Sequence, residues 1–239
     1  MHLDTPAIIV AVLPHGEHGA VVRFLTPGAG LVAGYVRGGR SRRLRPVLQP
    51  GNGVMLQLRS RVDSQLAAAT VELTAARAAL ATGGIAVAAL DWLTALCAQA
   101  LPQDMPHPAL YRALAALTEA IAAAALPLTL GEGVVRFEWL LLAELGFAPD
   151  VSCCVATGVT TDLIYVSPKS SQAVSRAAGA PYASRLLPLP DFLTGDAPAD
   201  AGSIGDGLRL TGHFLERDVL TGRGREILPA RERLIGRLG

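Results

Sequence analysis

Short apolar runs separated by glycine and proline mark the start of the chain. We predict five strands there, over residues 7–13, 20–26, 30–36, 54–60 and 66–73. Turn-forming residues follow the first three runs, and the fourth run places Val54, Leu56 and Leu58 on one face. Five short strands with this punctuation favour a small closed barrel of the OB-fold type. The sequence leaves the order of strand pairing open.

Apolar residues recur at helical spacing in the middle of the chain. Three such faces are marked by Ile85, Ala89, Trp92 and Leu96; by Leu110, Leu114, Leu117 and Ile121; and by Val134, Phe137, Leu141 and Leu145. These faces can bury one another in a helical bundle, and Gly146 is a C-cap candidate for the third helix. The charged residues that we expect to point outward are Arg77, Arg112, Arg136 and Glu138.

The rest of the chain combines an irregular segment with two further helical stretches. Residues 148–203 are rich in proline and glycine, with a strand candidate at 163–166. Helical patterns at about 208–220 and 225–238 carry apolar positions suited to packing against the bundle. The predicted fold class is therefore α+β. A five-stranded OB-fold domain at residues 1–74 precedes a helical domain at 75–239, which carries an irregular insertion at about 148–203.

Composition narrows the class of protein. Of 239 residues, 51% are hydrophobic, which is enough for a core and excludes wholesale disorder. The longest stretches without a charged residue, such as 78–90, are shorter than the about 20 apolar residues of a transmembrane helix. The first residues lack the basic segment of a secretory signal, and three cysteines, two of them adjacent, favour a reducing compartment. We therefore expect a cytoplasmic protein without membrane association.

Basic charge is concentrated near the start of the chain. The net charge of the whole chain is +1, yet no acidic residue occurs between Glu17 and Asp63. Eight arginines lie in that interval: Arg23, Arg37, Arg40, Arg42, Arg43, Arg45, Arg59 and Arg61. Five of the eight fall within residues 37–45, on a predicted loop with two glycines that would let a ligand approach the backbone.

Guanidinium groups hold phosphates through paired hydrogen bonds, so these eight arginines are the candidate nucleic-acid-binding residues. The predicted barrel offers few aromatic side chains on which bases could stack. Binding should therefore rest on phosphates and depend steeply on salt.

Other polar clusters do not form a recognisable catalytic or metal site. His15, Glu17 and His18 fall in a predicted hairpin turn, which explains them without a metal. Cys153 and Cys154 are adjacent, whereas structural zinc needs two ligand pairs with short spacers, so we expect free thiols. No Walker-type phosphate loop and no nucleophile-elbow motif occurs. We expect no catalytic residue, no metal, no cofactor and no enzymatic activity.

An ordered series of short motifs gives nearly the whole chain a resemblance to a known family. The motifs include Gly16-Glu17, Arg37-Gly38-Gly39-Arg40, Leu48-Gln49-Pro50, Glu144-Leu145-Gly146-Phe147, Leu187-Pro188-Leu189-Pro190 and Leu228-Pro229-Ala230-Arg231. In this order they resemble the RecO family of bacterial recombination mediators in DNA repair. Many members carry a cysteine zinc motif in the insertion. Here Cys154 matches its first cysteine, Thr157-Gly158 stands where Cys-Gly would be, and the second pair is missing. The resemblance thus implies a zinc-finger-like insertion that lacks the zinc ligands and is held by packing.

The resemblance also implies a function and partners. It implies binding to single- and double-stranded DNA, annealing of complementary strands, and loading of RecA onto protein-coated single strands. The implied partners are RecR and the single-stranded-DNA-binding protein, with RecA reached indirectly, and the implied location is the nucleoid. The residues themselves support the polyanion-binding half of this role. They leave open two alternatives on the same barrel, an RNA-binding module and a protein-interaction module.

Overall fold

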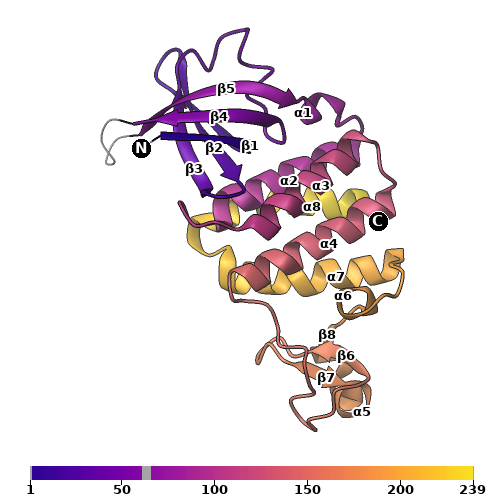
Figure 1. Cartoon of the computed structure of the whole chain (residues 1–239). Helices are drawn as coiled ribbons and strands as arrows, with labels where there is room; N and C mark the ends of the chain where they lie inside the picture. The colour runs from indigo at the N-terminus through magenta and orange to yellow at the C-terminus, as the bar shows by residue number, and fades with distance from the viewer. Residues whose placement is uncertain (1, 61–65, 239) are drawn as a thin grey trace. The chain divides into compact units, whose positions relative to one another are not determined.

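Five strands close into a barrel in the computed structural model of the chain, which describes residues 2–60 and 66–238 (Figure 1). The strands are β1 (His2–His15), β2 (Gly19–Thr26), β3 (Gly30–Val36), β4 (Gly53–Arg59) and β5 (Ala67–Ala75). Their order around the barrel is β1-β2-β3-β5-β4, and each neighbouring pair is antiparallel except β3 with β5. The predicted five-stranded OB-fold barrel is therefore confirmed.

Alternation along the strands fills the interior of this barrel. On β4, Leu56 and Leu58 are fully buried, whereas Met55, which precedes Leu56, is exposed. Strand β1 begins at His2, earlier than predicted, because its first half pairs with β4 and its second half with β2. Ile8 takes part in both pairings, and a register shift between Ile9 and Ala11 follows it, as expected for a bulge that bends a strand around a barrel.

The barrel belongs to a compact unit that spans residues 1–125 and 227–234. Its helices include α1 (Arg77–Leu80), α2 (Gly84–Ala100) and α3 (Pro108–Ala122). Helix α2 packs against β1 and buries Trp92, Leu96 and Cys97, and α3 packs against β2 and buries Leu110 and Leu114. The unit extends past the barrel because these helices share their apolar faces with its strands.

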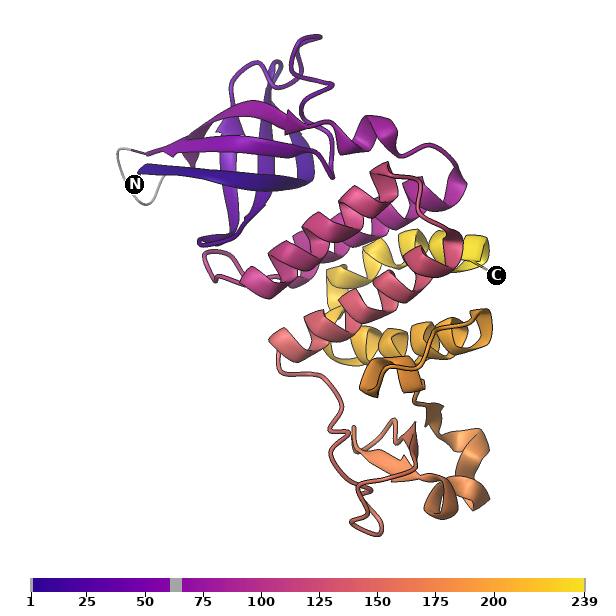
Figure 2. The ribbon, with the colours of Figure 1, turned by 45° about the vertical axis from the view of Figure 1, so that its right-hand side comes forward.

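A second compact unit spans residues 126–226 and 235–239. It contains α4 (Pro127–Glu144), α7 (Ala201–Phe214) and a π-helical turn η2 (Leu215–Val219). The 3-10 helix η3 (Gly222–Ile227) and helix α8 (Leu228–Leu238) are divided between the units. Helices α4 and α7 run side by side, as both ribbon views show (Figure 2). The predicted apolar positions Val134, Phe137 and Leu141 are buried on α4. Gly146 follows the C-terminus of α4 with φ +79°, which confirms the predicted glycine cap.

A small three-stranded sheet forms the centre of the insertion between α4 and α7, in the order β7-β6-β8. Its elements are β6 (Leu163–Val166), β7 (Ala173–Ser175), α5 (Arg176–Gly179), η1 (Ala180–Arg185), β8 (Leu187–Pro188) and α6 (Asp191–Thr194). Strand β6 lies where the sequence predicted it. Helix α7 begins at Ala201, inside the range predicted as insertion, because Asp200 and Ser203 form a reciprocal capping box.

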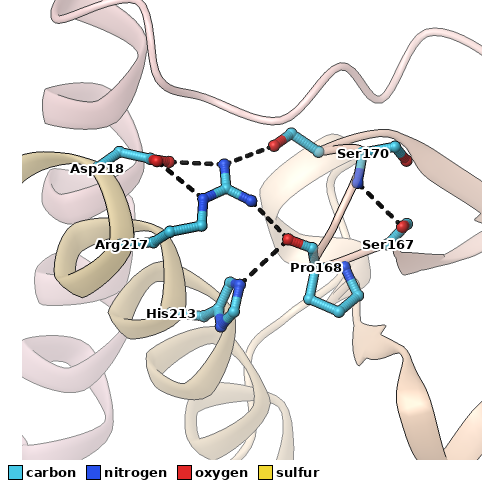
Figure 3. Close-up of polar contacts among 7 residues, drawn as sticks. Ser167, Pro168, Ser170, His213, Arg217 and Asp218 are labelled. Carbon is cyan, nitrogen blue, oxygen red and sulfur yellow. Dashed lines mark hydrogen bonds and ion pairs between the residues drawn. The ribbon is translucent and has the colours of Figure 1, made fainter.

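Hydrogen bonds tie the insertion to the end of α7 (Figure 3). His213 Nε2 lies 3.3 Å from the carbonyl oxygen of Pro168, and Arg217 donates to the same oxygen. The Arg217 guanidinium also donates to Ser171 Oγ at 2.7 Å and to the carboxylate of Asp218. This part of the insertion is thus held by side chains of α7 and η2.

One charged side chain of α4 points in a direction that the sequence did not predict. We expected Glu138 to point outward, and this expectation is wrong, because the side chain is fully buried. Its carboxylate accepts a hydrogen bond from the Thr211 hydroxyl on α7. Glu138 lies one helical turn from the buried residues Val134, Leu141 and Leu142, so helical geometry directs its side chain inward despite its charge.

Candidate nucleic-acid interface

The segment between β3 and β4, residues 37–52, is called here the arginine loop, and it has an apolar and a basic side. Two bonds of helical type shape its middle, from Arg45 N to the Ser41 carbonyl at 2.9 Å and from Leu48 N to the Leu44 carbonyl at 2.8 Å. Leu44, Val47 and Leu48 pack against the barrel core, while the neighbouring arginines are exposed. Because of this helical spacing, one side of the segment packs on the barrel core and the other side exposes the basic residues.

Asn52 fixes the loop at its end. Its side chain is buried, and Nδ2 donates to the carbonyl oxygens of Pro46 and Val47 at 3.0 Å each. Oδ1 accepts from the backbone N–H of Ala78 at 3.0 Å. One amide therefore joins the loop backbone to the segment that follows the barrel.

The two glycines of the loop have structural reasons of their own. Gly38 has φ +67°, in the left-handed region that favours glycine. Gly39 is buried, and a Cβ added there would lie 2.8 Å from the Cβ of Ala20 on β2. The loop can approach β2 this closely only because residue 39 has no side chain.

The structure brings five of the predicted arginines together on this loop. Arg37, Arg42, Arg43 and Arg45 are exposed, and none of them takes part in an ion pair within residues 2–60 and 66–238. Arg40 is exposed as well, and its Nη1 donates to the carbonyl oxygens at 16 and 17, at 3.3 and 3.1 Å. Arg40 therefore ties the arginine loop to the β1–β2 hairpin.

The other three predicted arginines are placed differently. Arg59 is exposed at the end of β4, where it pairs with His2 of β1. Arg61 lies outside the described residues. Arg23 is half-buried, and its guanidinium donates to the carbonyl of Ala98 in the last turn of α2. That carbonyl has no partner within the helix, so Arg23 caps α2, and burial lowers its pKa.

Strand register adds a row of side chains that the sequence did not reveal. Tyr35 on β3 pairs with Ala68 on β5, and Ala68 pairs with Arg59 on β4. Arg59 and Ala68 are exposed and Tyr35 is partly exposed, on the outer face of the barrel. The ring of His15 meets Tyr35 edge-on, with centroids 5.8 Å apart. An aromatic surface thus lies in one row with a cation, which suits contact with bases and phosphates. The alternation of Tyr35 with the buried Val36 was the available signal, but the neighbouring strands could not be read from it.

The hairpin turn that connects β1 and β2 contains the histidine cluster noted in the sequence. Residues 16–18 form the turn, as predicted. In the described part of the chain, no group of three or more His, Cys, Asp and Glu residues is placed to hold a metal ion.

The cysteines of the insertion do not fit a zinc site. Cys154 is buried, and its sulfur accepts a hydrogen bond from the backbone N–H of Ser175 at 3.3 Å. Hydrogen bonds from Ser175 and Thr157 lower the pKa of the Cys154 thiol to about 6. These neighbours supply hydrogen bonds to the sulfur where a zinc site would supply further thiolates. Cys153, Cys154 and Cys97 form no disulfide in the described chain, and burial raises the pKa of Cys97 to about 12.

A helix that spans a membrane must be both long and apolar. No helix within the described ranges combines the length and the hydropathy that a membrane span requires.

Comparison with known proteins identifies the family. Residues 1–77 match the family model described as Recombination protein O N terminal, and residues 82–225 match Recombination protein O C terminal. The chain is 45% identical over 240 residues to the DNA repair protein RecO of Rhodospirillum rubrum, covering 97% of this chain and 94% of that protein. It is 44% identical over 240 residues to the DNA repair protein RecO of Phenylobacterium zucineum, covering 100% and 98% of the two chains. The corresponding protein of Caulobacter vibrioides is 42% identical over 240 residues, with the same coverage. With both of its parts matched and its relatives aligned from end to end, this chain belongs to the RecO family of DNA repair and recombination proteins.

Proposed function

We propose that this protein is a recombination mediator that binds single- and double-stranded DNA through the arginine loop of its barrel. The observation that carries the proposal is the state of Arg37, Arg42, Arg43 and Arg45. All four are exposed, without an ion-pair partner in the described chain, and lie in an interval free of acidic residues. Unpaired guanidinium groups gathered on one loop favour a polyanion, because they release counterions when phosphates replace them.

Annealing of complementary strands follows from the same chemistry. Two strands repel each other through their phosphates, and arginines on a surface loop reduce that repulsion. Contacts to phosphates leave the base edges free, so base pairing can select the product. A protein of this kind speeds annealing without reading sequence.

We extend the proposal to protein partners and location. In this role the protein binds RecR and the single-stranded-DNA-binding protein and helps load RecA onto coated single strands, in the cytoplasm at the nucleoid. Membership of a DNA repair and recombination family supports these partners. Co-sedimentation of the purified proteins, with and without single-stranded DNA, tests each of them.

The DNA-binding test uses fluorescence anisotropy with a labelled single strand at about 50 to 200 mM salt. The variant Arg37→Gln/Arg42→Gln/Arg43→Gln should bind more weakly and flatten the log–log salt slope by roughly two units, at about 0.7 per phosphate contact. The same variant should anneal complementary strands more slowly. A control with the same change in charge replaces exposed arginines elsewhere, in Arg112→Gln/Arg185→Gln/Arg223→Gln.

Three outcomes contradict the proposal. Equal salt slopes for both triple variants would mean that the arginine loop does not contact phosphates. Tighter binding to a matched RNA strand than to DNA would favour the RNA-binding module. No binding to any strand at low salt would favour the protein-interaction module.

A further inference from the structure

A hollow of about 520 Å³ lies between the β1–β2 hairpin and the arginine loop. Its lining includes Val12, Ala20, Arg40, Arg45, Leu48 and Gln49. This volume lies within the roughly 300–1,000 Å³ of sites that take small molecules. The hollow is a separate feature from the outer row of Tyr35 and Arg59, because none of its lining residues belongs to that row.

Arginines stand beside apolar side chains in this hollow. Val12, Ala20 and Leu48 supply an apolar wall that belongs to the barrel core or packs on it. Arg40 and Arg45 supply two cations, and Arg40 is held in place by two carbonyl oxygens of the hairpin turn. A ligand that satisfies both parts needs an anionic group next to a flat, weakly polar one.

Gln49 adds a hydrogen-bonding group with a defined orientation. Its Nε2 donates to the carbonyl of Arg45 at 2.7 Å, which fixes the amide. The amide oxygen Oε1 keeps its capacity to accept a hydrogen bond from a ligand. A nucleobase carries such donors on its edge.

We propose that this hollow takes one unstacked nucleotide of a bound DNA strand, with its base against the apolar wall and its phosphate at Arg40 and Arg45. The inference rests on the proposed function and deepens it, because it makes the protein sensitive to bases as well as to phosphates. Bases in a duplex are paired and stacked, so only a single strand can present one at no unpairing cost. The hollow therefore favours single strands, while the exposed arginines serve both forms of DNA.

The test compares two strands with the same phosphates. One is a thymine oligonucleotide of about ten residues, and the other is its fully abasic counterpart with a tetrahydrofuran at each sugar. Full-length protein should bind the base-bearing strand about tenfold more tightly, near the lower limit for contacts that stack a base. The ratio of the two dissociation constants is the readout, since phosphate contacts cancel in it.

Two variants alter the hollow in different ways. Val12→Phe fills it, and Gln49→Leu keeps its size but removes the amide; either change should lower the ratio towards one without changing the salt slope. The variant Arg37→Gln/Arg42→Gln/Arg43→Gln should do the reverse, with a flatter slope and an unchanged ratio. Thermal melting establishes that each variant is folded, and Gln49→Leu carries the test if Val12→Phe is not.

The possible failures are distinguishable. Equal affinity of the wild type for both strands overturns the inference and leaves the proposed function intact. A ratio that survives both hollow variants but falls in Tyr35→Ala also overturns it, because the base then stacks on the outer face. Absence of binding to either strand overturns the inference together with the proposed function.

Discussion

Replacing Asn52 with alanine removes three hydrogen bonds from the base of the arginine loop. The Asn52 side chain is 1% exposed, and its amide joins the carbonyls of Pro46 and Val47 to the N–H of Ala78. Each such bond contributes about 1 kcal/mol net, so the expected loss is about 3 kcal/mol of unfolding free energy. Because two of the three bonds hold the loop backbone, DNA binding should weaken as well.

Asn52→Asp tests which of these hydrogen bonds matter, because it retains the acceptor and removes the donor. A carboxylate can still accept from the Ala78 N–H, but it cannot donate to the two loop carbonyls. Instead it places negative charge against their oxygens in a buried site. The loss at neutral pH should therefore be at least as large as for alanine, although the side chain has the same size.

The assay is urea unfolding in a Trp139→Phe background. The chain has two tryptophans, and Trp92 is fully buried on α2, in the same compact unit as the barrel. Its fluorescence therefore reports the unit that contains Asn52. Gln57→Ala is the matched control, because its amide makes one exposed hydrogen bond, to Asp4 at 3.0 Å, and its loss should stay within about 0.5 kcal/mol. If Asn52→Ala lowers stability no more than Gln57→Ala, the anchoring role is refuted.

Three further variants test other parts of the structure. Gly39→Ala should lower the free energy of unfolding in urea by about 1–3 kcal/mol, because the new Cβ would lie 2.8 Å from the Cβ of Ala20 on β2. An unchanged free energy would mean that the loop shifts freely. Thr211→Val deprives the buried Glu138 carboxylate of a hydrogen bond and should cost about 1.5–3 kcal/mol. Both residues lie in the second compact unit, so this loss is measured by urea unfolding followed by circular dichroism, and an unchanged midpoint would speak against the contact. Hydrogen bonds from Ser175 depress the pKa of Cys154 from 9.0 to about 6, so stability should rise from pH 6 to pH 9 and fall again as pH drops through that range. The melting temperature of Cys154→Ser, followed under reducing conditions, should lack this rise.

Local patterns correctly predicted an element where its own residues show the apolar–polar alternation and turn-forming residues mark both of its ends. Strand β3 occupies residues 30–36, as predicted, because a turn glycine opens it and a glycine pair follows it. Strand β1 begins at His2, five positions before its apolar run. Pairing with β4 extends the strand over residues 2–6, although these residues do not continue the apolar pattern. The parallel pairing of β3 with β5 joins residues distant in sequence, so the row containing Tyr35 and Arg59 could not be predicted.

The partners of charged residues were the least predictable part of the structure. Arg23 belongs to the acid-free interval, yet its guanidinium caps α2 at Ala98. Glu138 lies on a helix with an apolar face, yet it is buried with Thr211 as a partner. In both cases the partner lies on an element that follows much later in the chain, and composition or periodicity carries no information about it. The exposure of the loop arginines could be predicted, because it follows from a charged loop segment between two strands and requires no partner elsewhere in the chain.

Two demands act on different side chains of the arginine loop. Exposed arginines give the loop its basic charge, and buried side chains hold it against the barrel. Mutual repulsion among Arg37, Arg42, Arg43 and Arg45 opposes the folded loop in the absence of DNA. Leu48 in the barrel core and the Asn52 amide oppose that repulsion. Because the cations point outward while the anchors point inward, substitutions can separate the two demands. Changes to the exposed arginines should alter the salt dependence of DNA binding at constant or increased stability, whereas changes to the anchors should lower stability and DNA binding together. The basic surface is therefore a property of how this loop is packed as well as of its charge.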